Sequence, residues 1–263
     1  MKISLCSIKY TDEKIEDVVR KVSHLGYDGI EIVIDHIEDY LKRGKELNSL
    51  KRLIYSYELK VPIIAPHFNF TGSEEERERS VENALRFIEY AEALDCPLIR
   101  VFTGKVGAKE ATKKQWEQCV SSLKEICGVA HRKKITFVLE THPHQLMDTV
   151  ESTLKLVQRV NSPNLKVLLD IWHLFNEGKA DPVEALNRLF PYIMHVHAKN
   201  MIRKPQENQI AYFEDGDMEY PIFLEALKKS GYNRYISVEW FGGNPWEAAK
   251  HELKYLRQFF PKS

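Results

Sequence analysis

Short apolar runs alternate with longer amphipathic segments along the whole chain. The apolar runs are rich in Ile, Val and Leu and show little polar alternation, which is typical of strands covered on both faces of a sheet. Between them, apolar residues recur at helical spacing. The pattern predicts eight strands, over residues 2–8, 28–34, 61–68, 97–102, 135–140, 165–170, 192–197 and 235–240.

These strand–helix units follow one another without a linker rich in Pro, Gly or Ser. Eight units fit a closed barrel better than a doubly wound sheet, which usually has fewer strands. A chain of 263 residues also lies within the usual size of such a barrel. We therefore expect an α/β fold in which residues 1–263 form a single (β/α)8-barrel domain.

Capping signals mark the starts of several helices. Ser73 with Glu76, and Asp148 with Glu151, have the spacing of a capping box, in which two side chains satisfy backbone N–H groups reciprocally. Segment 200–218 has no regular pattern. In a barrel this segment follows the seventh strand, and we expect it to form a long loop over the barrel mouth.

The composition narrows the class of protein and its partners. Lys+Arg and Asp+Glu are both 38, and this zero formal charge argues against a nucleic-acid partner. No apolar run approaches the ~20 residues of a membrane span, and the start of the chain turns polar too soon for a signal peptide. The cysteines show no CxxC spacing and are expected to be free, buried thiols: Cys6, Cys96, Cys119 and Cys127. We expect a cytoplasmic protein that acts on a small molecule, and a homo-oligomer remains open.

Polar residues end four consecutive strands. Three carboxylates and one imidazole stand there: Glu140, Asp170, His197 and Glu239. Each alone could be a helix cap or a hydrogen-bonded core residue, but in a barrel all four strand ends point to one mouth. Such an oxygen-rich set suits Mn²⁺, Mg²⁺, Co²⁺ or Zn²⁺. We therefore predict one divalent metal ion, with Mn²⁺ the foremost candidate.

A second group of polar residues lies close to these four in sequence. It comprises His67, Arg100, His142, His173 and Lys199. Cations at a barrel mouth suit an anionic or enolate-like ligand, so we expect this group to bind substrate. For His144 and His195 we expect structural hydrogen bonds. Glu31, on the second strand, either reaches the site or forms a salt bridge below it.

The chain also resembles a known family. The segments that carry the resemblance are IRVFTG from Ile99, LETHP from Leu139, PNLK from Pro163, LDIWH from Leu169, ADPV from Ala180, HVHAKN from His195 and EWFG from Glu239. They resemble the xylose-isomerase-like TIM-barrel superfamily, which holds sugar (phosphate) isomerases and epimerases, inosose-type dehydratases and endonuclease-IV-like repair enzymes. Within it they are notably similar to the bacterial 3-dehydroshikimate dehydratases of petrobactin biosynthesis. The resemblance implies the same four metal ligands and a polar pocket formed by Arg100, His142, His173 and Lys199.

Two enzymatic hypotheses follow, and both use a metal to acidify a C–H bond beside a carbonyl. In an isomerase or epimerase, Glu140 and Glu239 are ligands and bases on either side of an enediolate. In a dehydratase, a lyase, His142 takes the proton while Arg100 and Lys199 hold a substrate carboxylate. On the breadth of the family we slightly favour the isomerase or epimerase of carbohydrate metabolism. A non-catalytic binding barrel and a DNA-repair endonuclease are the less favoured alternatives.

Overall fold

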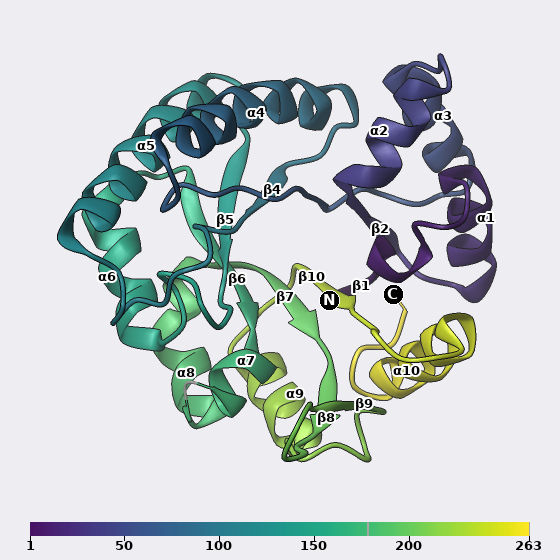
Figure 1. Ribbon diagram of the computed structural model, residues 1–263. Helices are drawn as coiled ribbons and strands as arrows, with labels where there is room; N and C mark the ends of the chain where they lie inside the picture. Colours follow the sequence, from purple (N-terminus) through teal and green to yellow (C-terminus); the bar gives the residue numbers. More distant parts are fainter. Residues whose placement is uncertain (178, 263) are drawn as a thin grey trace.

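The computed structural model describes residues 1–177 and 179–262, and a closed barrel of parallel strands forms its centre (Figure 1). Strand β10 pairs with both β1 and β7, which closes the barrel. The expected α/β barrel is therefore confirmed. The barrel strands are β1 (Lys2–Cys6), β2 (Gly29–Val33), β3 (Ile63–Ala65), β4 (Leu98–Val101), β5 (Thr136–Glu140), β6 (Leu165–Asp170), β7 (Ile193–Ala198) and β10 (Tyr235–Val238).

Helices form an outer ring around the barrel (Figure 1). Their apolar residues recur at helical spacing and face the strands; in α1, for example, Ile15, Val18, Val19 and Val22 are all fully buried. The ring consists of α1 (Ile15–Leu25), α2 (Ile34–Lys42), α3 (Leu47–Ser56), α4 (Glu74–Ala93), α5 (Lys113–Arg132), α6 (Val150–Val160), α7 (Ile171–Asn176), α8 (Pro182–Leu189), α9 (Tyr220–Lys229) and α10 (Pro245–Phe259), with short 3-10 turns η1 (Ser7–Tyr10) and η2 (Phe190–Tyr192).

One of the two expected capping boxes is confirmed. Ser73 and Glu76 satisfy each other's backbone N–H groups at the start of α4. The box expected for Asp148 and Glu151 is wrong by one residue, because Thr149 caps α6 together with Ser152. Asp148 instead accepts a hydrogen bond from the backbone N–H of Ala108 at 2.9 Å, and so connects the loops after β4 and β5.

Segment 200–218 is more ordered than expected. An antiparallel hairpin forms within it, from β8 (Asn200–Ile202) and β9 (Gln209–Ala211). The buried Asn200 side chain donates to the carbonyl oxygens of Phe213 and Met218, both at 2.9 Å, which folds the rest of the segment back onto the hairpin. The expectation that the segment lacks regular structure is therefore wrong, whereas Met201 does lie at the barrel mouth, where we expected the segment.

The pleat of the strands decides which residues enter the barrel. Side chains alternate between its inside and outside, so every second residue of a strand points inward. Val138 on β5 and Leu168 on β6 pack together in an apolar layer with Ile63, Leu98 and the partly buried Met194. Glu140 and Asp170 stand two residues further along the same strands and therefore also point inward, in a polar layer nearer the carboxyl ends of the strands.

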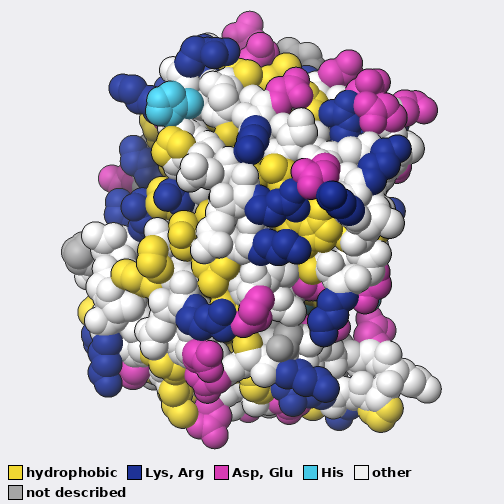
Figure 2. Space-filling model, turned by 90° about the vertical axis from the view of Figure 1, so that its left-hand side faces the viewer, with side chains coloured by type: hydrophobic (Ala, Val, Ile, Leu, Met, Phe, Trp, Pro, Cys, Tyr) yellow, Lys and Arg dark blue, Asp and Glu magenta, His cyan; other side chains and the backbone are white. Residues whose placement is uncertain are grey.

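The remaining global expectations concern thiols, membranes and surface charge. All four cysteines are buried and free, as expected. Among the described residues, no helix has the length and apolarity that a membrane crossing needs. Figure 2 shows the face over α5 and α6, where Lys and Arg side chains gather with acidic groups around them. Between these two helices, Arg159 of α6 pairs with Glu117 of α5 at 2.8 Å.

Candidate active site

The four predicted metal ligands meet at one end of the barrel. Glu140 and Asp170 are the last residues of β5 and β6, and His197 is the last residue but one of β7. We had expected Glu239 to end its strand, but it directly follows β10. One ligand atom from each residue lies within 4.8 Å of those of the other three, and all four side chains are buried.

The imidazole of His197 is oriented toward this group by a carboxylate behind it. Its Nε2 lies 3.0 Å from both carboxylate oxygens of Glu31. A carboxylate only accepts, so Nε2 carries a proton and donates it. Nδ1 faces the other way, 3.2 Å from Oε1 of Glu140, 3.7 Å from Oε2 of Glu239 and 3.9 Å from Oδ2 of Asp170.

These atoms fit a divalent cation. Among the described residues, the buried Nδ1 of His197 has no hydrogen-bond partner, and Oε2 of Glu140 and Oδ2 of Asp170 accept no well-aligned hydrogen bond, although each lies beside a buried cation. Buried nitrogen and oxygen atoms without partners are costly, and a cation between them removes that cost. One imidazole and three carboxylates form a donor set suited to Mn²⁺ or Zn²⁺.

Two buried cations neutralise part of the carboxylate charge. Nζ of Lys199 lies 2.6 Å from Oδ2 of Asp170 and 2.6 Å from Oε2 of Glu239. Nη1 of Arg100 lies 3.2 Å from Oε2 of Glu140. Burial alone would raise the pKa of Glu140, but His197, Arg100 and Lys199 outweigh it and hold that pKa well below its usual range. Glu140 is therefore a weak base.

A cavity of about 310 Å³ opens above these ligands. It is lined by Glu140, Glu239 and all five residues expected to bind substrate: His67, Arg100, His142, His173 and Lys199. Its remaining walls are apolar and consist of Ile8, Phe102, Met201 and Phe241. The sequence did not single out Ile8, Phe102 or Met201 as cavity residues. Phe102 could have been found, because it stands two residues after Arg100 and the arginine packs against its ring at 4.4 Å. Ile8 and Met201 carry no comparable sequence signal.

His142 differs from the other polar groups of the cavity in its hydrogen bonding. Its Nδ1 lies 2.8 Å from the carbonyl oxygen of Pro143. Since a carbonyl oxygen only accepts, Nδ1 carries the proton, and in the neutral ring Nε2 keeps its lone pair. The ring packs against those of His173 at 4.3 Å and Phe102 at 5.0 Å between centroids. The arrangement gives His142 one nitrogen able to take a proton.

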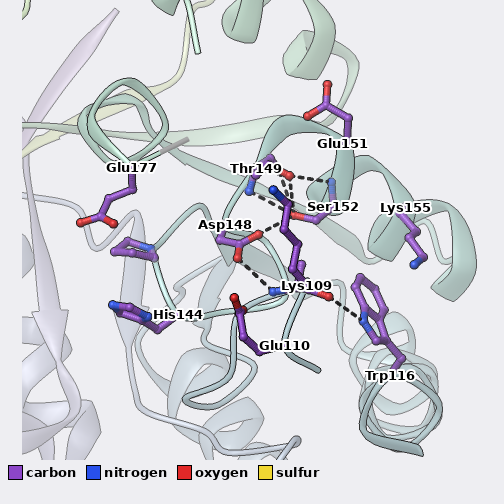
Figure 3. A pocket seen from close by; sticks show the side chains of 13 residues that line it. Lys109, Glu110, Trp116, His144, Asp148, Thr149, Glu151, Ser152, Lys155 and Glu177 are labelled. Carbon is purple, nitrogen blue, oxygen red and sulfur yellow. Dashed lines mark hydrogen bonds between the residues drawn. The ribbon is translucent and has the colours of Figure 1, made fainter. Parts of the chain in front are cut away.

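The residues with weaker expectations are also placed. His195 forms the structural hydrogen bond that we expected, with Ser237 at 2.7 Å. Glu31 reaches the metal-ligand group through His197, one of the two alternatives. His144 is exposed and lines a hollow of about 460 Å³ on the outer rim, where Figure 3 shows it opposite Asp148. This hollow shares no lining residue with the cavity over the ligands.

Comparison with known proteins places this geometry in a family. Residues 19–259 match the family described as the xylose isomerase-like TIM barrel. A 3-dehydroshikimate dehydratase of Bacillus anthracis is 29% identical over 279 residues, covering 97% of this chain and 96% of that protein. An L-ribulose-5-phosphate 3-epimerase of Escherichia coli (strain SMS-3-5 / SECEC) is 26% identical, covering 82% of this chain and 78% of the epimerase.

Solved structures of other proteins show the same fold. The crystal structure of the probable 3-DHS dehydratase AsbF from Bacillus anthracis, involved in petrobactin synthesis, superposes with a TM-score of 0.88 at 26% identity, covering 97% of this chain and 98% of AsbF. The IolI protein with a bound zinc atom covers both chains completely with a TM-score of 0.85, and its 20% identity shows the fold alone. This chain belongs to the xylose isomerase-like TIM-barrel family.

Proposed function

We propose that the protein is a metal-dependent lyase that dehydrates a cyclic β-hydroxy ketone bearing a carboxylate, such as 3-dehydroshikimate. Its relatives of known activity, a dehydratase and an epimerase among them, support an enzyme. The breadth of the family that the sequence resembles slightly favoured an isomerase or epimerase. The dehydratase of Bacillus anthracis, similar along almost the whole chain, and the hydrogen bonding at the mouth favour the alternative.

One observation carries the choice: which group at the mouth is free to act as a base. Both oxygen-bearing candidates are held by cations, Glu140 by Arg100 and Glu239 by Lys199. One oxygen of each carboxylate is thereby occupied by a cation, and Glu140, whose pKa is held below its usual range, accepts a proton poorly. His142 Nε2 keeps its lone pair because Nδ1 donates to Pro143. Histidine is also the side chain most often used as a general base.

The reaction that we propose begins with the C–H bond beside the substrate ketone. His142 Nε2 takes this proton, and the electron pair of the broken bond forms an enolate. The enolate electrons then form a C=C bond as the β-hydroxyl group leaves, and the departing oxygen takes the proton back from His142 Nε2 to become water, which regenerates the base. A bound divalent ion would polarise the ketone oxygen and so make the C–H bond more acidic. Further enolisation of a 3-dehydroshikimate product gives an aromatic acid.

The cavity walls suit a ring of this kind. Phe102 and Phe241 provide apolar surface, and Arg100 and Lys199 provide positive charge for a carboxylate. Both cations also contact metal-ligand carboxylates, so we expect them to share their N–H donors between the enzyme and the substrate. A polyhydroxylated open-chain sugar would leave more of its hydroxyl groups against apolar walls, where an unpaired hydroxyl is costly.

The isomerase or epimerase remains the second candidate. Glu140 and Glu239 support it, because oxygens of both belong to the same compact group of ligand atoms, as two bases on opposite sides of a substrate would require. The identity to the Escherichia coli epimerase supports it as well. It needs at least one of the two carboxylates to lose its ion pair in the substrate complex.

A substrate screen tests the proposal. Chelator-treated protein is reloaded with Mn²⁺, Zn²⁺ or Mg²⁺ and incubated separately with 3-dehydroshikimate and with a set of ketoses and ketose phosphates, followed by NMR. We expect water loss from 3-dehydroshikimate and no interconversion of the sugars. Interconversion of a ketose with no dehydration would favour the second candidate and contradict the first.

A further inference from the structure

Inside the barrel lies a carboxylate that the proposed reaction does not use. Glu31, on β2, is fully buried inside the barrel, on the far side of His197 from the metal-ligand group. A buried carboxylate is costly unless its charge is compensated. Its nearest partners are the imidazoles of His197, at 3.0 Å, and of His195, at 3.5 Å. Glu31 therefore needs an explanation of its own.

We infer that Glu31 is the positioning residue of the metal centre: it fixes the imidazole of His197 with Nδ1 facing the metal and sets the affinity for the ion. The inference rests on the metal centre of the proposed function. The contact of Nε2 with both Glu31 oxygens fixes the ring plane as well as the tautomer. Carboxylates that hold a metal-bound imidazole in this way raise metal affinity in other proteins.

A hydrogen-bonded chain from other strands holds Glu31 in turn. Ser4 Oγ on β1 lies 2.8 Å from Ser237 Oγ on β10, and Ser237 Oγ lies 2.7 Å from Nε2 of His195 on β7. The imidazole of His195 contacts Glu31 at 3.5 Å. All four side chains are completely buried. The position of Glu31 is therefore set by three further strands and not by solvent.

The buried charges give Glu31 a second role. Four buried carboxylates surround the centre: Glu31, Glu140, Asp170 and Glu239. Two buried cations, Arg100 and Lys199, face them. With neutral imidazoles, the excess of two negative charges equals the charge of one divalent ion. Removing the charge of Glu31 would leave the loaded centre with one positive charge too many.

Metal binding without substrate tests the inference. Chelator-treated wild type, Glu31→Gln and Glu31→Ala are titrated with Zn²⁺ against a chromophoric chelator. Glu31→Gln keeps a hydrogen-bond acceptor and loses the charge, and Glu31→Ala loses both. The matched control is Asp28→Asn, which changes a largely buried carboxylate that pairs with Arg257 at 2.9 Å and belongs to none of the candidate metal-binding groups among the described residues. We expect affinity to fall about 10–100-fold in the Glu31 variants, more in Glu31→Ala, and to stay at the wild-type value in the control.

Two outcomes would overturn the inference. One is unchanged Zn²⁺ affinity in folded Glu31 variants. The other is two ions per wild-type chain, one of them lost in Glu31→Gln, because Glu31, His195 and His197 would then form a second metal site. Should both variants fail to fold, NMR of ¹⁵N-histidine-labelled, Zn²⁺-loaded wild type decides. We expect the proton of His197 on Nε2 and the metal on Nδ1. A proton on Nδ1 with the metal on Nε2 would contradict the inference.

The same experiments separate this inference from the proposed reaction. Wild type that binds Zn²⁺ in a Glu31-dependent manner but does not dehydrate 3-dehydroshikimate leaves Glu31 in its role and contradicts the dehydratase. If wild type dehydrates 3-dehydroshikimate but the Glu31 variants bind Zn²⁺ as tightly as wild type, the dehydratase is supported and the role of Glu31 is contradicted. Wild type that binds no ion contradicts the metal centre, and with it both.

Discussion

Arg100 and Glu140 form an ion pair inside the barrel mouth, with Nη1 and Oε2 3.2 Å apart and each side chain only 2% exposed. The two residues lie on the neighbouring strands β4 and β5, close to the point where both strands end. The pair occupies a carboxylate oxygen that an isomerase of this kind would need as a base. It also brings a guanidinium group to the cavity where a substrate carboxylate is expected.

Breaking this pair should destabilise the metal-free protein strongly. Arg100→Gln leaves Glu140 as a buried charge without its cation, and removal of one partner of a buried pair typically costs about 3–5 kcal/mol. We expect that loss in the free energy of unfolding, measured by denaturant titration after chelation. Arg159→Gln is the control, because it breaks the half-exposed pair with Glu117, which is worth about 0–1 kcal/mol. Equal losses of unfolding free energy in the two variants would mean that the buried pair stabilises the fold no more than the half-exposed pair does, and would contradict the prediction.

Asp170 should be required for metal binding but not for folding. Asp170→Asn keeps the size of the side chain and removes a charged ligand, so we expect a normal circular dichroism spectrum and loss of most metal affinity. Elemental analysis of the reloaded protein should find about one ion per wild-type chain and much less in the variant. Wild-type stoichiometry in Asp170→Asn would show that our ligand set is wrong.

Metal affinity should increase with pH. Burial alone would lower the pKa of His197, but Glu31, Glu239 and Glu140 outweigh it and raise that pKa well above its usual value in the metal-free protein. Below this pKa a proton occupies the imidazole, and metal binding must release it. We expect affinity to rise by up to about tenfold per pH unit in this range. Titration calorimetry in buffers of different ionisation enthalpy measures the released proton, and no proton release below pH 7 would contradict the prediction.

The sequence predicted which side chains meet at the mouth because barrel topology makes strand ends converge. Glu140, Asp170, His197 and Glu239 needed only their positions at the ends of apolar runs. Their mutual distances depend on strand register, which no periodicity reports. On β6 and β7 the register shifts between Val167 and Leu168, and this places Asp170 opposite His197.

Contacts across the inside of the barrel were harder to predict. β2 and β7 are not neighbours in the sheet, so the contact of Glu31 with His197 follows from the width of the barrel and not from pairing. The hairpin in 200–218 was missed because its two strands have three residues each and show no alternation of apolar and polar positions. Hydrogen bonds of the Asn200 side chain support it instead.

Glu252 should make stability depend on pH far from the active site. Burial, helped by the nearby charge of Glu214, raises its pKa from 4.5 to about 9. The folded state therefore holds a proton that the unfolded state releases above pH 4.5, so this stabilisation is complete at low pH and is lost as pH rises toward 9. Glu252→Gln keeps the acceptor for the N–H of Phe213 and removes the titration. We expect it to unfold at a higher temperature than wild type at pH 9, with a difference that shrinks toward pH 5; a constant difference would contradict this.

The most direct test of the proposed reaction is the rate of 3-dehydroshikimate dehydration by wild type and by His142→Ala, both loaded with Mn²⁺ and followed by the ultraviolet absorbance of the aromatic product. Loss of a general base typically costs ~10²–10⁴-fold in rate, whereas loss of one substrate hydrogen bond costs about 0.5–3 kcal/mol. We predict turnover by wild type and a fall within the larger range for His142→Ala, with metal affinity unchanged. Absence of the aromatic product with wild type, together with α-proton exchange of a ketose in D₂O that survives in His142→Ala, would contradict the dehydratase and identify the carboxylates as the bases.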